Sequence, residues 1–258
     1  MTLAIAGANA AIVLAIATVL WLASVRLRDA SIVDPWWSIL FLSITANTVR
    51  SAGLGPRNGV LLSLVAIWAI RLWAHLLRRS RGKPEDPRYA AFRERFGRER
   101  YWWVSFFQVF LLQGALALLV SAPLQVAAAA PPSAPLAWMD AAGIALFLAG
   151  FTFEAVADAQ LQRFRDDPST RGQVMDRGLW SLSRHPNYFG EAVLWWGFGC
   201  FALGSPHGWV ALAGPALMTF LLLRVSGVPM LDAHLRATRP GYAAYCARTP
   251  PFVPRWRG

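Results

Sequence analysis

Residues that could bind a polar ligand are concentrated at positions 183–191, which read Ser-Arg-His-Pro-Asn-Tyr-Phe-Gly-Glu and lead directly into an apolar stretch. Membrane insertion needs none of these polar side chains, but a polar ligand at a membrane surface could contact all of them. Pro186 favours a helix start here, and the free N–H groups of a helix N-terminus suit phosphate or carboxylate. The alternative is an interfacial cap whose arginine meets lipid headgroups. We expect a binding site, with candidate residues Arg184, His185, Asn187, Tyr188, Glu191 and Trp195.

A second polar cluster consists of Glu154, Asp158, Gln162 and Arg165, whose spacing puts them on one face of a helix. The ordinary interpretation is a solvated helical face with an internal Asp–Arg pair. Glu154, however, lies within an apolar stretch that should be buried in the membrane, where an ionisable side chain is costly and usually has a function. We therefore expect these residues to belong to the ligand site, together with Arg171 in the polar segment that follows.

A third polar group follows the last apolar stretch. A basic tail at such a place is often only an anchor for anionic lipids. Two tyrosines three positions apart beside an arginine instead suggest a binding role. The group consists of Arg224, Ser226, Asp232, His234, Arg236, Arg239, Tyr242, Tyr245 and Arg248. The candidate residues in it are Arg224, Ser226, Tyr242, Tyr245 and Arg248.

Near the other end of the chain, Asp34 precedes Pro35, Trp36 and Trp37. Aspartate before proline is a common helix N-cap. The alternative is a carboxyl group in an aromatic pocket, where desolvation would keep it protonated and able to donate a proton. The two interpretations stay open at this stage.

The elements that must position these residues are membrane helices. Hydrophobic residues make up 56% of the chain, thirteen residues are tryptophan, and the apolar residues fall in blocks of a length that crosses a bilayer. Apart from Arg50 and Arg57, every Lys and Arg falls on one side if the N-terminus is outside and the C-terminus is cytoplasmic. This topology, and not nucleic-acid binding, explains the net charge of +11. We predict an all-α integral membrane protein with seven spans, at about 3–25, 31–49, 58–78, 104–122, 136–157, 188–204 and 208–230.

The segments between the spans give fewer signals. Aromatic and charged residues interleave at 79–103, which we interpret as an interfacial helix with an aromatic belt rather than a ligand site. Residues 123–135 form an uncharged, Pro- and Ala-rich loop. Cys200 and Cys246 lack metal-ligand spacing, so we expect no metal site. The sequence contains no glycine-rich phosphate loop.

Two stretches give the chain a resemblance to a known family. Residues 179–191, Leu-Trp-Ser-Leu-Ser-Arg-His-Pro-Asn-Tyr-Phe-Gly-Glu, and residues 239–245, Arg-Pro-Gly-Tyr-Ala-Ala-Tyr, resemble the signature of the steroid 5α-reductase family. The bacterial members are similar also in Ser-Ile-Val-Asp-Pro-Trp at 31–36 and Glu-Asp-Pro-Arg-Tyr at 85–89. The resemblance implies a seven-helix membrane enzyme that uses NADPH to reduce the Δ4 double bond of 3-oxo-steroids.

The resemblance also implies roles for single residues. Asp158 matches an acidic residue that meets polar groups of the cofactor, and Arg165 matches a phosphate-binding arginine. Asn187 matches an asparagine beside the nicotinamide, and Lys83 lies in a basic turn of the Arg-Gly-Arg-Pro type.

Animal relatives place a span-2 glutamate and a span-3 tyrosine around the steroid ketone. Asp34 is the nearest acidic candidate here, and Trp68 replaces the tyrosine, so we take these two as the catalytic candidates. Trp36, Trp37 and Trp73 would line the steroid-like substrate.

The sequence thus predicts one reductase domain. Spans 1–4, within about residues 1–125, would hold the lipid substrate, and spans 5–7, within about 136–258, would hold NADPH. We expect a monomer in the bacterial inner membrane with its cofactor site facing the cytoplasm. Two rivals stay open. The first is a methyltransferase, because isoprenylcysteine carboxyl methyltransferases, which bind S-adenosylmethionine, are similar in the same Arg-His-Pro region. The second is a non-catalytic lipid-binding protein, in which the polar clusters at 154–165 and 184–191 would have no function.

Overall fold

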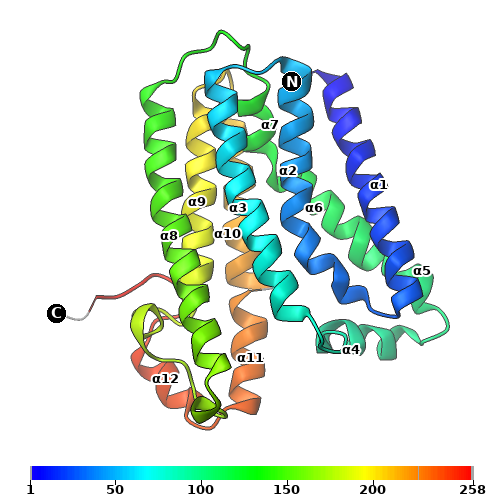
Figure 1. Cartoon of the computed structure of the whole chain (residues 1–258), viewed down its shortest axis with the longest axis vertical. Helices are drawn as coiled ribbons and strands as arrows, with labels where there is room; N and C mark the ends of the chain where they lie inside the picture. The colour runs from blue at the N-terminus through cyan, green and yellow to red at the C-terminus, as the bar shows by residue number, and fades with distance from the viewer. Residues whose placement is uncertain (1, 226, 257–258) are drawn as a thin grey trace. The chain divides into compact units, whose positions relative to one another are not determined.

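Every regular element in the described part of the chain is helical. The structure is a computed structural model and describes residues 2–225 and 227–256 (Figure 1). It divides into two compact units, Met1–Leu136 with Ser205–Ala211 and Ala137–Gly204 with Leu212–Gly258. Each unit is described by itself below.

Helices occupy each of the seven intervals that the sequence predicts. Among the described residues, five helical stretches are long and apolar enough to cross a membrane: Leu3–Leu27, Pro56–Ser80, Tyr101–Val120, Trp138–Asp166 and Gly208–Thr238. The helices α2 (Val33–Ala52) and α9 (Pro186–Leu203) fall outside this set. Polar residues lower the mean hydropathy of both: α2 contains Asp34, Asn47 and Arg50, and α9 contains Asn187 and Glu191 in its first turns. The chain is therefore an integral membrane protein by its apolar helices.

In the first unit, α2 is the central helix. It packs against α1 (Leu3–Leu27), α3 (Pro56–Ser80), α6 (Leu112–Val120) and α7 (Ala122–Ala128). The short elements that complete this unit are η1 (Ala30–Ile32), α4 (Pro87–Phe96), α5 (Tyr101–Ser105) and the π-helical segment η2 (Phe106–Leu111).

Buried polar side chains tie three of these helices together. The Asn9 side chain donates to Thr48 Oγ1 (3.0 Å) and to Gln125 Oε1 (3.1 Å), and it accepts from Asn47 Nδ2 (2.8 Å). Gln125 belongs to α7, whose apolar residues are also buried. The prediction of a plain loop over 123–135 was therefore wrong for its first part, because a buried amide partner and small alanines let that part fold as a helix against α2 and α3.

In the second unit, glycines bring two helices into backbone contact. The helix α8 (Trp138–Asp166) runs beside α9 (Figure 1), with Gly143 against Gly197 and Gly150 against Gly190. A Cβ atom on Gly150 would lie 2.5 Å from the carbonyl oxygen of Gly190. Small residues at such seven-residue spacing allow membrane helices to approach closely. This packing brings the polar end of α8 next to the start of α9.

The rest of this unit consists of short helices. In chain order they are η3 (Pro168–Thr170), η4 (Gly178–Ser181), η5 (Gly208–Leu212, of which Leu212 belongs to this unit), α10 (Ala213–Phe220), the π-helical η6 (Leu221–Val225), α11 (Val228–Thr238) and α12 (Tyr242–Arg248).

The segment after α12 pairs with the turn that precedes α9. The backbone N–H of Arg184 donates to the carbonyl of Pro250, and that of Arg255 donates to the carbonyl of Leu182, both at 2.9 Å. Ser183 Oγ donates to the carbonyl of Phe252 at 2.7 Å. Residues 182–184 are thus held in place by residues 250–255.

Candidate functional site

A cavity of about 230 Å³ lies within the second unit, at the polar end of α8. Its lining contains five of the residues that the sequence predicts for the ligand site, and these are Arg165, Arg171, Arg184, Tyr242 and Tyr245. The remaining lining residues are Leu161, Phe164, Thr170, Gly172, Gln173, Val174, Met175, Trp180, Leu231, Leu235 and Arg239. The cavity therefore combines four arginines with an aromatic and aliphatic wall.

Two helix faces and one loop position this lining. Leu231, Leu235 and Arg239 are spaced four residues apart, so they share one face along α11 and its C-cap. The last turns of α8 supply Phe164 and Arg165. Six consecutive loop residues, 170–175, close a further side.

Asp232 of α11 joins three donors from the site. Its carboxylate contacts Arg184 Nη2 at 2.9 Å and His185 Nε2 at 2.9 Å, and it accepts from the Tyr242 hydroxyl at 2.5 Å. Burial and this hydrogen bond raise the pKa of Tyr242, so the phenol stays protonated. Asp232 belongs to the third polar group of the sequence but was not among its candidate residues, because its contact with the buried His185 can be seen only in the fold.

The second tyrosine of the pair stiffens the cavity wall. Tyr245 donates its hydroxyl proton to the carbonyl of Trp180 at 2.5 Å, and the indole N–H of Trp180 donates to the carbonyl of Ala157 at 3.0 Å. Burial raises the pKa of Tyr245. The Arg248 guanidinium, which lies outside the cavity, pairs with Asp176 at 2.6 Å and fastens the loop to α12.

The start of α9 carries polar atoms that lack a hydrogen-bond partner within the described residues. Asn187 donates from Nδ2 to Asp158 Oδ1 at 3.1 Å, but its Oδ1 has no partner. The same holds for Nε of Arg184 and for Nδ1 of His185, whose side chain is fully buried and stacks on Tyr188. Leaving buried donors and acceptors unsatisfied costs free energy, so these atoms mark places where a ligand could bind.

The other predicted cofactor residues occupy varied positions. Glu154 and Trp195 are buried in the α8 and α9 packing, and Glu191 follows Asn187 by one turn on α9. Gln162 donates to Asp166 at 2.7 Å, and neither of these two residues lines the cavity.

Two further predicted residues lie apart from the cavity lining, and a third is not among the described residues. Arg224 is exposed on η6, and Lys83 is exposed in the first unit. Ser226 lies outside the described residues.

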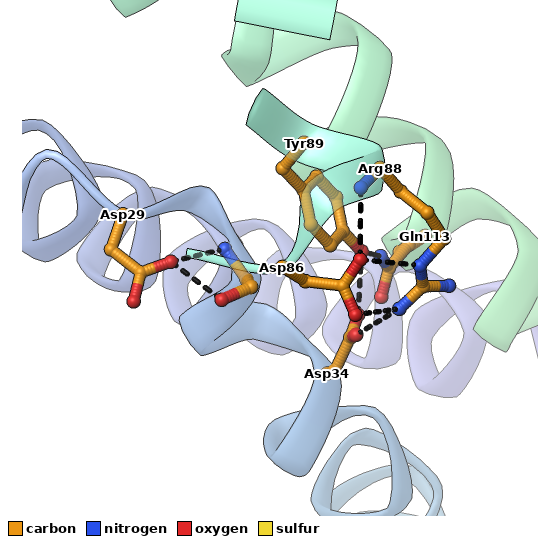
Figure 2. Close-up of polar contacts among 7 residues, drawn as sticks. Asp29, Asp34, Asp86, Arg88, Tyr89 and Gln113 are labelled. Atoms are coloured by element: carbon orange, nitrogen blue, oxygen red, sulfur yellow. Dashed lines mark hydrogen bonds and ion pairs between the residues drawn. The ribbon is translucent and has the colours of Figure 1, made fainter. Parts of the chain in front are cut away.

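In the first unit, Asp34 is the centre of a second polar cluster (Figure 2). Its Oδ2 pairs with Arg88 Nη2 at 2.7 Å, and its Oδ1 accepts from the Tyr89 hydroxyl at 2.5 Å. Gln113 Nε2 donates to the same tyrosine oxygen at 3.1 Å. Asp86 caps α4 and accepts from Arg88 Nε at 2.9 Å. Three helices that are distant in the sequence, α2, α4 and α6, thus meet around one phenol.

The interpretation of Asp34 as a helix N-cap was wrong. Asp34 is the second residue of α2 and makes no cap bond, since Ile32 is the N-cap. Its two carboxylate oxygens accept from Arg88 Nη2 and from the Tyr89 hydroxyl. Asp34 therefore stays a predicted acid, and the Tyr89 phenol, which contacts it, is a second candidate for the proton donor.

The interpretation of 79–103 as only an interfacial aromatic belt also fails at Tyr89. This side chain is buried, with 6% of the residue exposed. Burial and the neighbouring Asp34 carboxylate raise its pKa well above the ordinary value, so the phenol stays protonated. Tyr89 ends the Glu-Asp-Pro-Arg-Tyr stretch at 85–89, which contributes to the family resemblance. The π-helical η2 ends directly before Leu112 and Gln113, and such segments are frequent at functional sites.

The predicted aromatic residues form a layer between α2 and α3. The Trp36 ring lies edge-on to the Trp73 ring, with 6.1 Å between the ring centroids. The centroid of the Phe41 ring lies 5.3 Å from that of Trp37 and 5.8 Å from that of Trp68. Trp68 is fully buried on α3. The tyrosine that contacts Asp34 is Tyr89 of α4.

Comparisons with known proteins place the chain in a family. Residues 20–249 match the family described as "Protein of unknown function (DUF1295)". The chain belongs to this family. The DUF1295 family is related to steroid 5α-reductase-like membrane proteins. The chain is also similar to the uncharacterized protein C594.04c of Schizosaccharomyces pombe, with 26% identity over 274 residues, covering 93% of this chain and 77% of the yeast protein. No solved structure matches.

Proposed function

We propose that this DUF1295 protein is a membrane reductase that uses NADPH to reduce the Δ4 double bond of a 3-oxo-steroid or a similar lipid enone. The cavity of the second unit is the observation that carries the proposal. Four arginines surround it, and arginine binds phosphate groups through two parallel hydrogen bonds. The steroid 5α-reductase-like signature at 179–191 borders the same cavity through Trp180 and Arg184.

The residues present fit a dinucleotide. The aromatic wall suits a base, the arginines suit phosphates, and the unpartnered atoms of Arg184, His185 and Asn187 suit an amide or ribose hydroxyls. NADPH, when bound, supplies a hydride. Asp158 would orient Asn187, which it already contacts. Asp232 would hold Arg184 and His185 in place.

The Tyr89 cluster supports the acid step of the same reaction. An enone that takes a hydride at its β-carbon develops negative charge on the carbonyl oxygen and becomes an enolate. The Tyr89 hydroxyl would stabilise that charge and give its proton to the oxygen, which forms an enol; the enol then tautomerises to the saturated ketone, and the tyrosine regains a proton from water. Gln113 and Asp34 would fix the position of the phenol.

The topology we propose has seven spans. α2 and α9 would cross the membrane as well, because each is about the length a span requires and the basic residues then fall on one side. The N-terminus would be outside, the C-terminus and the cofactor site cytoplasmic, and the protein a monomer in the bacterial inner membrane.

Cofactor binding by the purified protein tests the proposal. In detergent, NADPH should bind, and a 3-oxo-Δ4-steroid should then be reduced with loss of NADPH absorbance. S-adenosylmethionine should not bind, because its sulfonium cation would meet four arginines. Binding of S-adenosylmethionine without NADPH would instead favour a methyltransferase, and binding of neither would favour a lipid-binding protein.

A further inference from the structure

The four arginines around the cavity differ in how their charge is balanced. Arg184 is paired with the Asp232 carboxylate and is largely buried, with 10% of its side chain exposed. Arg171 and Arg239 have no carboxylate within ion-pair distance among residues 2–225 and 227–256. The contact of the Arg239 guanidinium is to the carbonyl of its neighbour Thr238, at 3.4 Å. These two cations therefore have charge available for an anion.

The two residues approach the cavity from different segments. Arg171 is the C-cap of η3 and is followed by Gly172, whose φ of +80° turns the chain. Arg239 is the C-cap of α11 and precedes the Pro-Gly-Tyr turn. A cation at a helix C-terminus can also serve the helix dipole. Arg236, in the last turn of α11 but absent from the cavity lining, offers a direct control for that simpler role.

The size of the cavity limits what it can hold. Its volume of about 230 Å³ lies below the ~300–1,000 Å³ typical of pockets for whole drug-sized ligands. One end of a dinucleotide fits this space better than the complete molecule. Phe164, Trp180 and Tyr242 offer flat apolar surface for a base, next to the arginines.

We infer that this cavity binds the adenosine end of the cofactor, and that Arg171 and Arg239 together bind a phosphomonoester on its ribose. These two residues would then make the site selective for the phosphorylated dinucleotide. The inference rests on the proposed function and adds to it the residues that determine cofactor choice. Arg184 is a positioning residue in this scheme, because the Asp232 carboxylate already balances its charge.

Equilibrium binding to the purified full-length protein tests the inference. The ligands are NADPH, NADH, adenosine 2′,5′-bisphosphate and adenosine 5′-monophosphate, and the variants are Arg171→Gln and Arg239→Gln. A charge-assisted hydrogen bond contributes enough that each variant should bind NADPH about 10- to 100-fold more weakly. NADH affinity should change by less than about twofold, since NADH lacks the group that these arginines contact. Both residues are exposed, so the variants should fold.

Matched controls separate the possible outcomes. Arg236→Gln and Arg177→Gln remove exposed charges outside the cavity lining and should leave both affinities unchanged. The inference is overturned, while the proposed function stands, if Arg239→Gln weakens the binding of NADPH and of NADH equally. The same holds if Arg239→Gln weakens NADPH binding no more than Arg236→Gln does. If the wild-type protein binds neither dinucleotide, both fail. Inorganic phosphate and short-chain phosphatidic acid should compete only weakly, and competition as strong as that of the 2′,5′-bisphosphate would overturn the nucleotide assignment.

Discussion

Replacing Gly150 by alanine should separate α8 from α9. The new methyl carbon would lie 2.5 Å from the carbonyl oxygen of Gly190 and 2.5 Å from the amide nitrogen of Leu194. Carbon–oxygen contacts in proteins lie at about 3.3–3.6 Å, so the helices would have to move apart by roughly 1 Å. The atoms in the way belong to backbone, which cannot rotate aside.

The expected loss of stability follows from two opposing terms. Overpacking of a tight interface costs about 1–3 kcal/mol, and two backbone clashes place this site at the upper end. Alanine offsets about 0.5–1 kcal/mol of that cost through its better helix propensity. The net loss is about 2 kcal/mol, which for a chain of this size lowers the melting temperature by roughly 4–8 °C.

Gly7→Ala is the matched control. Gly7 lies within α1, and a Cβ atom there would meet nothing within 4 Å. This variant should therefore gain helix propensity without a clash and melt at or slightly above the wild-type temperature. Thermal unfolding of both variants and the wild type in one detergent provides the measurement. Gly150→Ala should also weaken NADPH binding, because the 3.1 Å contact between Asn187 and Asp158 spans the same two helices. A Gly150→Ala protein as stable as the Gly7→Ala protein would refute the reasoning.

Three other predictions concern single side chains. Tyr89→Phe should lower the rate of enone reduction by about 10²- to 10⁴-fold with unchanged NADPH affinity, and near-normal turnover would exclude Tyr89 as the proton donor. Asp34→Asn should lower the rate of enone reduction less than Tyr89→Phe does, because the amide oxygen can still accept a hydrogen bond from the phenol. A larger loss in Asp34→Asn would identify Asp34 as the proton donor. Asn9→Leu should destabilise the first unit by about 2–4 kcal/mol, because it leaves the buried partners of Asn9 unsatisfied; thermal unfolding measures this, and an unchanged melting temperature would contradict it.

The length of the apolar blocks located the long helices, because blocks of membrane length leave little choice of structure. Five of the residues predicted for the ligand site also line one cavity, since they come from the polar segments 158–187 and 242–248. The helix α7 was missed because alanine and proline over 123–135 give no periodic signal, and the buried amide of Gln125 is meaningful only beside Asn9.

The Tyr89 cluster was missed for a different reason. Its members are far apart in the sequence, and an amphipathic pattern hides one buried phenol among exposed aromatic residues. Asp34 could be singled out from its tryptophan neighbours, but its partner Arg88 lies 54 positions away in the sequence. Chemistry that depends on such pairings cannot be inferred from local spacing.

The pairing of residues 250–255 with residues 182–184 has a consequence for biosynthesis. Ser183 and Phe252 are 69 positions apart, so at ~5–20 residues per second a ribosome adds the second segment roughly 3–14 s after the first. During that interval α8 and α9 can already be inserted and packed, whereas the turn before α9 still lacks its partners. A chain interrupted before residue 250 would therefore be a membrane-integrated protein with an unfinished ligand site. Ligand binding therefore requires a chain that extends past residue 250. A fluorescent reporter fused before residue 250 would also detect chains that are integrated in the membrane but cannot bind the ligand.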